Sequence, residues 1–253
     1  MAIPVYEEIA DMILKSKMTV VLTGAGVSTE SGIPDFRSPN SGLWEKVDPM
    51  EALSKGVLYN RPDVFYNVGF KILGSMRGAS PNKAHIILSK MEKEGYIDSI
   101  ITQNIDNLHY EAGSVDVMEV HGNLKTMHCL KCGERYGYDV VEEKIKKGEI
   151  PPICHCGGVI RTDVVLFGDS LPKCFDRAWR KAQKADLMIV VGSSLQVSPV
   201  NYLPSLSKKL IIINYGETAQ DSLADILYRE KASSALVNIY NKLKEKDDNT
   251  NGK

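Results

Sequence analysis

The stretch from Thr23 to Ser38, TGAGVSTESGIPDFRS, constrains this chain more than any other segment. It follows the apolar run Met18–Leu22, which is typical of a buried β-strand. Gly24 and Gly26 permit a tight turn and let the backbone approach a ligand, as in loops that present N–H groups to a phosphate. A plain glycine turn between a strand and a helix is the alternative. The charged and aromatic residues of PDFR favour a nucleotide pocket.

This loop departs from the usual dinucleotide fingerprint, which has a third glycine where this chain has Thr29. The next glycine is Gly32, so a helix need not begin at the usual position. Polar residues also follow the apolar run that ends at Ile101, in the sequence TQNIDNLH. Side chains at the end of a parallel strand are placed to bind ligands, although Asn104 or Asp106 can equally cap a helix.

The 253 residues are 43% apolar and 25% charged, with a formal net charge of −1, so a globular chain of one large domain or a large and a small one is expected. This balance does not suggest nucleic-acid binding. Val5, Ile9 and Ile13 lie at helical spacing, which indicates an amphipathic helix rather than a signal peptide. No apolar run is long enough to span a membrane. Five cysteines without a secretory signal favour thiols or metal over disulfides, and hence a cytoplasmic location.

Short runs rich in Val and Ile alternate with helical patterns along the chain, and several of them lack polar alternation, as strands buried on both faces do. Ser80 and Pro81 are expected to begin one helix, and Gly95 to end it. This alternation predicts an α/β fold with a doubly wound parallel sheet. The expected strands are Thr19–Thr23, Ser99–Thr102, Val117–Val120, Val164–Phe167, Leu187–Gly192 and Leu210–Asn214.

Three regions break the alternation. Residues 124–161 contain four cysteines and are interpreted as a small module inserted into a larger domain of residues 1–123 and 162–243. The turn-rich segment 39–62 is expected to be a mobile loop beside the pocket. The charged tail, 244–253, is predicted to be disordered.

The inserted module carries Cys129-x-x-Cys132 and Cys154-x-Cys156. Four thiolates satisfy a tetrahedral zinc ion and leave no open position, so the zinc would be structural. A redox pair at Cys129 and Cys132 is the weaker alternative, because two more cysteines follow at metal-site spacing.

These motifs resemble those of the sirtuins, which are NAD-dependent protein-lysine deacylases. GAGVSTESGIPDFRS is similar to the family's NAD-binding signature, and TQNIDNLH to its second signature. His121-Gly122 matches the catalytic His-Gly, and VVLFG (164–168) resembles the substrate strand. The resemblance covers roughly residues 5 to 243. One departure is the single residue, His155, between the third and fourth cysteines, where the family usually has two; His128 or His155 would then be competing zinc ligands.

The resemblance implies a Rossmann-like NAD-binding domain with a zinc module. It also implies NAD as co-substrate, one structural Zn²⁺, and acetylated protein lysines bound as an extended strand. His121 would deprotonate a ribose hydroxyl, with Asn104 and Asp106 positioning the ribose and the nicotinamide. The residues carried over as cofactor contacts are Gly24, Ala25, Gly26, Thr29, Phe36, Arg37, Gln103, Asn104, Ile105, Asp106, Gly192, Ser193, Ser194, Asn214, Tyr215, Gly216 and Ala232; those for substrate are Val165, Phe167, Gly168 and Val197.

The implied reaction converts acetyl-lysine and NAD to lysine, nicotinamide and O-acetyl-ADP-ribose. Members that remove succinyl groups carry a Tyr and, three residues later, an Arg, whereas this chain has Tyr66 and Gly69. Acetyl is therefore expected over succinyl. ADP-ribosyl transfer to protein and a non-catalytic sensor of NAD or ADP-ribose are the alternative functions. His121, Asn104 and Asp106 argue against a pure sensor.

Overall fold

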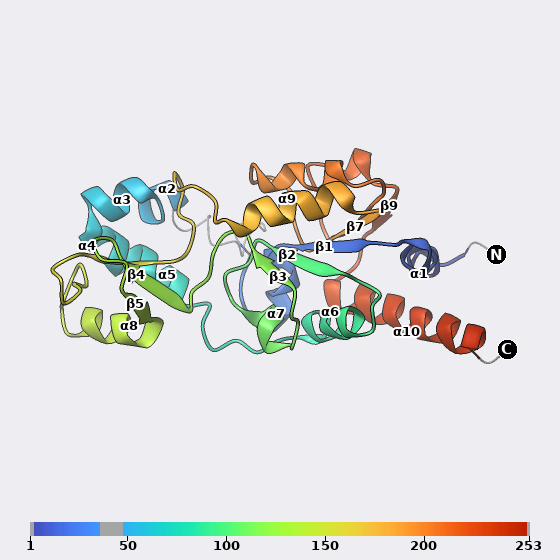
Figure 1. The fold of residues 1–253 in the computed structure, drawn as a ribbon, viewed down its shortest axis with the longest axis horizontal. Coiled ribbons are helices and arrows are strands. Elements are labelled where there is room, and N and C mark those ends of the chain that lie inside the picture. The colour runs from blue at the N-terminus through green and yellow to red at the C-terminus, as the bar shows by residue number, and fades with distance from the viewer. Residues whose placement is uncertain (1–2, 36–47, 252–253) are drawn as a thin grey trace.

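The computed structural model describes residues 3–35 and 48–251. Its larger lobe is built on a six-stranded parallel sheet in the order β3-β2-β1-β7-β8-β9 (Figure 1). This order confirms the doubly wound arrangement, in which ligands bind beyond the carboxyl ends of the strands where the order reverses. The strands are β1 (Thr19–Thr23), β2 (Ser99–Thr102), β3 (Val117–Glu119), β7 (Leu187–Val191), β8 (Leu210–Ile213) and β9 (Ile226–Tyr228).

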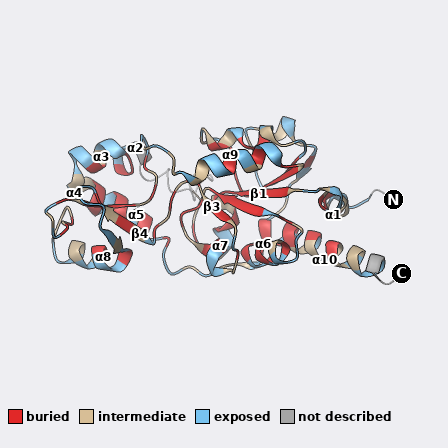
Figure 2. Cartoon of the chain, in the orientation of Figure 1, coloured by how far each residue is buried: buried red, intermediate tan, exposed pale blue. Residues whose placement is uncertain are grey.

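Helices cover both faces of this sheet, which explains the absence of polar alternation in its strands. Val21 and Ile100 face a cluster with α1 (Val5–Lys15), α6 (Lys83–Lys93) and α10 (Ala232–Asn251). Val20 and Leu22 face the opposite cluster, which includes α9 (Cys174–Lys184). The four central strands, β2, β1, β7 and β8, are buried along their length (Figure 2). Short elements join them: α7 (Leu108–Glu111) and the 3₁₀ turns Ala25–Val27, Thr29–Ser31, Val200–Tyr202, Pro204–Leu206 and Asp221–Leu223.

The smaller lobe combines two stretches of chain that lie side by side (Figure 1). One supplies an antiparallel sheet in the order β5-β4-β6, with β4 (Thr126–Cys129), β5 (Arg135–Gly137), β6 (Ile160–Thr162) and α8 (Tyr138–Lys146). The other is helical: α2 (Pro49–Ala52), α3 (Lys55–Asn60), α4 (Pro62–Val64), a π-helical turn (Phe65–Gly69) and α5 (Phe70–Gly74). The two share one hydrophobic cluster. Residues 49–74 thus share a core with the cysteine module, which Ile33, Ile105 and Leu108 of the larger domain also join, and the described part of the expected 39–62 loop is largely helical.

Two sequence-based expectations about element boundaries are wrong. Helix α6 begins at Lys83, not at Ser80 and Pro81, because Asn82 and His85 form a reciprocal cap: the Asn82 side chain accepts from Ala84 N–H at 2.8 Å, and His85 Nδ1 accepts from Asn82 N–H at 3.3 Å. The Val164–Phe167 segment is not a strand and makes only an isolated bridge, from Phe167 to Ser54.

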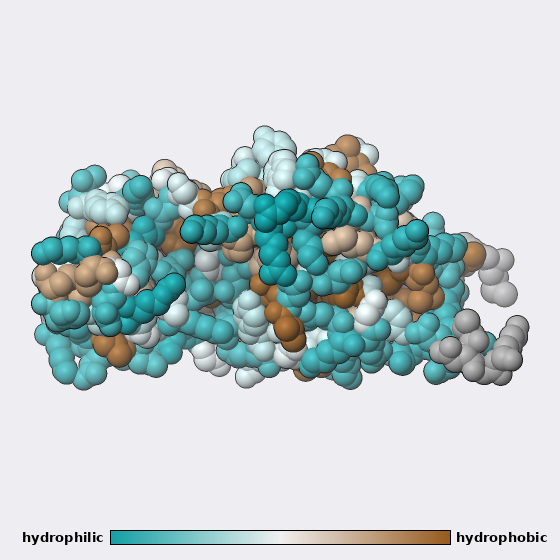
Figure 3. All heavy atoms as spheres, in the orientation of Figure 1, coloured by the Kyte–Doolittle hydropathy of each residue, from teal (hydrophilic) through white to brown (hydrophobic). Residues whose placement is uncertain are grey.

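Residues 244–251 of the charged tail are helical, since α10 continues to Asn251. Composition predicted disorder, but the tail's charges have partners on neighbouring elements. Lys244 lies 3.2 Å from Glu94, Lys246 pairs with Asp11, and Asp247 accepts from the hydroxyl of Tyr96. The side visible in Figure 3 is mostly hydrophilic, with apolar side chains in small groups. Among the described residues, no helix is both long and apolar enough to cross a membrane.

Candidate active site

The loop after β1 packs directly on the loop after β7. A Cβ atom at Gly24 would lie 2.8 Å from the carbonyl oxygen of Gly192, and one at Gly26 would lie 2.9 Å from Gly192 Cα. Gly192 itself has φ +63°. These glycines are therefore required by contact between two backbones, not only by approach to a ligand.

The same contact occupies most of the loop's amides. Gly24 N–H donates to Val191 O at 3.1 Å and Gly26 N–H to Gly192 O at 2.8 Å, and the next two amides close the 3₁₀ turn. Within the described part of the chain, Ala25 alone keeps an unpaired amide between Gly24 and Ser28. The expectation that the glycines present bare N–H groups is wrong. Thr29 is exposed, and its hydroxyl donates to Gly26 O at 3.0 Å.

Ser28 is the hub of a buried polar network that joins β1 to β2. Its side chain is 1% exposed. The hydroxyl donates to Asp106 Oδ2 at 2.6 Å and accepts from Asn104 Nδ2 at 2.9 Å. His85 Nε2 lies 3.3 Å away. Because His85 Nδ1 accepts the Asn82 amide, we assign the proton to Nε2, which donates to Ser28. Asn104 and Asp106 are thus held in fixed orientations beside the loop.

Two buried histidines support this network in their neutral form. Burial lowers the pKa of His85 to about 4, although the charge of Asp106 opposes the shift. Burial, with a smaller contribution from His85, lowers the pKa of His109 to about 3. His109 Nε2 lies 2.9 Å from the Thr23 hydroxyl. The ring centroids of His85 and His109 are 4.9 Å apart. Both therefore remain uncharged at neutral pH.

We predict that stability falls as pH drops from 6.5 towards 4. Because both folded-state pKa values lie below the unfolded value of about 6.5, the unfolded chain binds more protons in this window. Each histidine should cost about 2 kcal/mol of unfolding free energy at pH 5, since one pKa unit is worth about 1.4 kcal/mol. Urea unfolding at pH 7.5 and pH 5 measures the loss. His109→Gln should reduce it, and an equal pH dependence in that variant would contradict the assignment.

His121 lies beyond the end of β3 and its neutral ring has one nitrogen available. Nδ1 is 3.1 Å from the carbonyl oxygen of Gln103. A carbonyl only accepts, so Nδ1 carries the proton and Nε2 keeps its lone pair. Burial lowers the pKa of His121, partly opposed by the Gln103 carbonyl. Gly122 follows at φ +73°, where a Cβ would meet Asp163 O at 2.0 Å, so a glycine must follow this histidine.

The ends of β2 and β7 are bridged by Gln103, whose Nε2 donates to Ser193 Oγ at 2.9 Å. Ser193 also accepts from Leu195 N–H at 3.2 Å, while Ser194 is half-buried. Ile105 and Asp106 line a cavity of about 310 Å³ between the lobes. The parallel sheet therefore brings the predicted polar residues of three strand ends to one edge.

The residues directly after β8 are more exposed than the polar residues that follow β2 and β7. Asn214 Nδ2 donates to Gly216 O at 2.9 Å, and Tyr215 is 78% exposed. Ala232 is buried in the hydrophobic cluster at the start of α10, so its side chain contributes to the core. Val197 is half-buried, in the loop after β7. Phe36 and Arg37 lie outside the described residues.

The expected substrate segment connects His121 to the smaller lobe. Val165 N–H donates to His121 O at 2.9 Å. Phe167 N–H donates to Leu53 O at 3.0 Å, and Phe167 O accepts from Lys55 N–H at 2.9 Å. Gly168 has φ +89°. The segment is thus pinned by main-chain bonds on its flank although it forms no regular strand.

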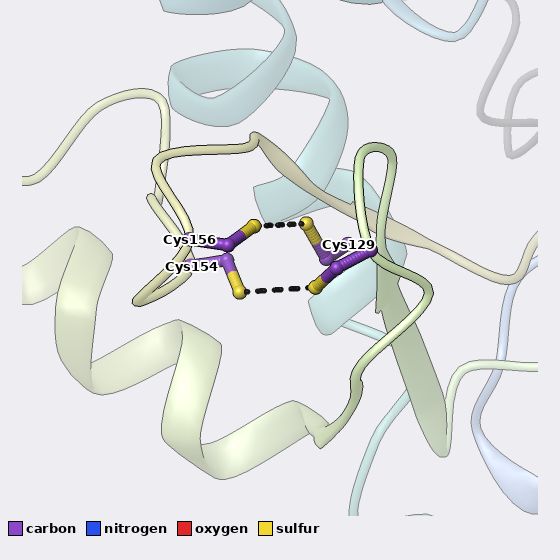
Figure 4. A group of neighbouring side chains, drawn as sticks. Cys129, Cys154 and Cys156 are labelled. Atoms are coloured by element: carbon purple, nitrogen blue, oxygen red, sulfur yellow. Dashed lines mark hydrogen bonds between the residues drawn. The ribbon is translucent and has the colours of Figure 1, made fainter.

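The four cysteines of the smaller lobe converge as a metal site requires. The sulfur atoms of Cys129, Cys132, Cys154 and Cys156 all lie within 4.8 Å of one another. Cys129 and Cys156 are separated by 3.5 Å, and Cys132 and Cys154 by 3.6 Å (Figure 4). Tetrahedral zinc with Zn–S bonds of about 2.3 Å needs sulfurs roughly 3.8 Å apart, so the thiols fit this ion.

The one-residue spacer does not prevent this convergence. A Cβ at Gly158 would lie 2.6 Å from the Cys129 sulfur, so a glycine lets the second loop approach. His128 instead points to Asp163, with Nδ1 2.5 Å from the carboxylate. His155 is exposed, and although its Nδ1 lies 3.5 Å from the Cys154 sulfur, it is not part of the converging group that the described residues form. Cys174, the fifth cysteine, is on α9, where its thiol donates to Glu119 O.

The sequence model of the Sir2 family matches residues 24–199. The chain belongs to the Sir2 family. It is 60% identical over 240 residues to NAD-dependent protein deacetylase 2 of Caldanaerobacter subterraneus subsp. tengcongensis, with 94% of this chain and 96% of that protein covered. It is 45% identical to the NAD-dependent protein deacetylase of Saccharolobus solfataricus, with 96% and 98% covered.

Solved Sir2 structures are also similar. One, with a deacetylated p53 peptide and 3′-O-acetyl-ADP-ribose, has a TM-score of 0.89 at 38% identity and covers 93% of this chain and 97% of that one. Another, with p53 peptide and NAD⁺, has a TM-score of 0.85 at 37% identity over the same shares. The sirtuin resemblance read from the motifs is therefore confirmed.

The sequence analysis of this Sir2 chain missed Ser28 and His85. Ser28 lies inside the first motif but carries no distinguishing signal there. His85 is marked only by its position three residues after Asn82, which is the spacing of a reciprocal helix cap. Its contact with Ser28 spans 57 residues of sequence.

Proposed function

We propose that this chain removes acetyl groups from protein lysines with NAD as co-substrate, giving nicotinamide, O-acetyl-ADP-ribose and free lysine. The observation that carries the proposal is the geometry of His121. Its Nδ1 is committed to Gln103 O, and its own carbonyl accepts the amide of Val165. The base and the substrate segment are thereby held together. The Sir2 relatives named deacetylases, and the Sir2 structures with peptide and NAD⁺, support the same reading.

NAD, when bound, supplies an electrophilic ribose carbon and the hydroxyls of that ribose. Nε2 of His121 accepts a proton from a ribose hydroxyl, since it is the ring nitrogen with a free lone pair. Asn104 and Asp106, oriented by Ser28, hold the ribose and the nicotinamide amide. The loops after β1, β7 and β8 line the rest of the cofactor site. Cys129, Cys132, Cys154 and Cys156 would hold a zinc ion that organises the smaller lobe and takes no part in the chemistry, because four thiolates would leave it no open position.

The acetylated peptide is proposed to bind as an extended strand along Val165–Gly168, with the acyl-lysine nitrogen donating to the Val165 carbonyl. Phe167, which is 36% exposed, is proposed to line the acyl channel. A cytoplasmic location is part of the same proposal, because a thiolate zinc site needs cysteines in their reduced form.

The test is an acetyl-lysine peptide incubated with and without NAD and analysed by mass spectrometry. Deacetylation predicts loss of the acetyl group from the peptide and formation of O-acetyl-ADP-ribose, both dependent on NAD. ADP-ribosyl transfer would instead add ADP-ribose to protein. Absence of nicotinamide release in the presence of both substrates would support the sensor alternative.

We predict a strong preference for acetyl-lysine over succinyl-lysine. Tyr66 is fully buried and its hydroxyl donates to Ile160 O at 2.5 Å, so it is not available to an acyl carboxylate. At Gly69 a Cβ would lie 2.2 Å from Ala52 O, which excludes an arginine there. A buried succinyl carboxylate would lack a partner, and we expect kcat/KM lower by about 100-fold or more. Comparable rates on matched acetyl and succinyl peptides would contradict this.

A further inference from the structure

A buried ion pair joins the two ends of the segment that carries the proposed peptide site. Arg161, on β6, lies before the segment, and Asp169 lies at its end. Their side chains are 10% and 11% exposed, and Arg161 Nη2 is 2.6 Å from Asp169 Oδ2. Nη1 donates to the other carboxylate oxygen at 3.1 Å, so the pair is bidentate. It contains none of the residues assigned above to catalysis, cofactor or metal.

The pair also binds the main chain between its two ends. Arg161 Nε donates to Thr162 O at 3.0 Å, and Nη2 donates to Val164 O at 3.1 Å. Asp169 Oδ2 accepts from Leu166 N–H at 3.0 Å, and the Asp169 amide donates back to Leu166 O at 2.9 Å. One guanidinium and one carboxylate thus satisfy the peptide groups at alternate positions along the segment.

This arrangement determines what the segment offers to a ligand. The Val165 amide is taken by His121 O at 2.9 Å. The Val165 carbonyl has no hydrogen-bond partner within residues 3–35 and 48–251. Because the carbonyl groups of Val164 and Leu166 on either side are fixed, the direction of the Val165 carbonyl is fixed as well. Regular strand pairing does not achieve this, since the segment forms only one isolated bridge.

We propose that Arg161 and Asp169 are positioning residues for substrate, which set the direction of the Val165 carbonyl and thereby the affinity for the acyl-lysine peptide. The inference rests on the proposed function in taking Val165–Gly168 as the peptide edge. A stabilising role alone does not explain the pair, because a buried ion pair adds little net stability over apolar residues of similar volume. A role in fixing one backbone conformation of the segment around Val165 does explain why the pair is present.

The charge state of the pair indicates that the ion pair is permanent at neutral pH and does not act as a pH switch. Burial alone would lower the pKa of Arg161, but its bonds to Asp169 outweigh burial and raise it. Burial alone would raise the pKa of Asp169, but Arg161 and the Leu166 amide outweigh burial and lower it. Both groups therefore stay charged at neutral pH, and the segment keeps one shape there.

The test measures peptide and NAD binding separately in Arg161→Lys and Asp169→Asn. A lysine ammonium cannot span Thr162 O, Val164 O and both carboxylate oxygens, and an asparagine removes the charge that holds the guanidinium. We expect the Kd for a fluorescent acetyl-lysine peptide to rise on the order of tenfold in each variant, as loss of charge-assisted bonds at a positioning site implies. The Kd for NAD should stay within about twofold, since the cofactor residues lie on other strand ends.

Asp186→Asn is the matched control. It breaks an ion pair with Lys208 at 2.7 Å, ahead of β7 at the opposite end of the sheet, and should change neither Kd. Thermal unfolding of every variant checks that it is folded. A raised Kd for the peptide with an unchanged Kd for NAD supports positioning, whereas an equal loss of peptide and NAD affinity indicates a merely structural role and overturns the inference.

Two outcomes separate this inference from the proposed function. If the wild-type protein binds the peptide but does not deacetylate it, the proposed function fails while the inference is still decided by the variants' Kd values. If the variants bind the peptide as tightly as the wild type, or the wild type does not bind it, the inference is wrong.

Discussion

His121→Ala is expected to lower deacetylation by about 10²- to 10⁴-fold, the contribution typical of a positioned general base. NAD binding should be retained, because the cofactor contacts proposed for the loops after β1, β7 and β8 do not involve this ring. The Gln103 carbonyl holds the Nδ1 proton, so only Nε2 can accept a proton from substrate. Mass spectrometry of the peptide measures turnover, and calorimetry measures NAD binding. A variant with near-normal turnover would remove His121 from the mechanism.

The pH dependence of the wild-type enzyme provides a second check of the same assignment. Burial lowers the pKa of His121 below the ordinary value of about 6.5, so the ring is neutral and competent at pH 7. Activity should fall as pH drops through this lowered pKa. The acid limb of kcat/KM therefore lies below pH 6.5, and it should be absent from the residual rate of His121→Ala. An acid limb at higher pH would mean that another group is the base.

The sequence predicted the parallel sheet, and the edge at which its polar residues gather, because both depend on local patterns. Runs such as Ser99–Thr102 are buried on both faces, and polar residues follow directly where each strand ends. In a parallel sheet those ends share an edge, so a contact such as the one between Gln103 and Ser193 can be expected without any knowledge of side-chain packing.

What the sequence did not predict depends on contacts between distant residues. Ser28 joins Asp106 across 78 residues, and nothing in its neighbourhood indicates that hydroxyl. The Val164–Phe167 segment has strand composition, but its peptide groups bond to Arg161, Asp169 and the smaller lobe instead of a sheet neighbour. The tail beyond residue 243 has the composition of a disordered segment, yet Lys246 has a partner in Asp11.

Removing the metal should unfold the smaller lobe and leave the larger sheet intact. Binding of structural zinc to a thiolate site is worth about 10–16 kcal/mol near pH 7, which is comparable to the stability of a whole domain. Cys129 and Cys154 are buried in the cluster that holds this lobe together. Apart from zinc, their loops are closed by a few main-chain bonds, such as Cys154 N–H to Gly158 O at 2.8 Å.

The experiment compares Cys132→Ser with Cys174→Ala, which removes the one cysteine outside the cluster. We expect about one zinc per chain in the wild type and in Cys174→Ala, and a large loss of zinc in Cys132→Ser. Hydrogen exchange should then show lost protection in β4–β6 and α8 but not in β1, β7 or β8, because the two lobes have separate hydrophobic clusters. Peptide turnover should disappear with the zinc, since the segment after β6 that carries Val165 begins in the smaller lobe. A chain that holds less than about one zinc yet keeps its fold and activity would contradict a structural metal.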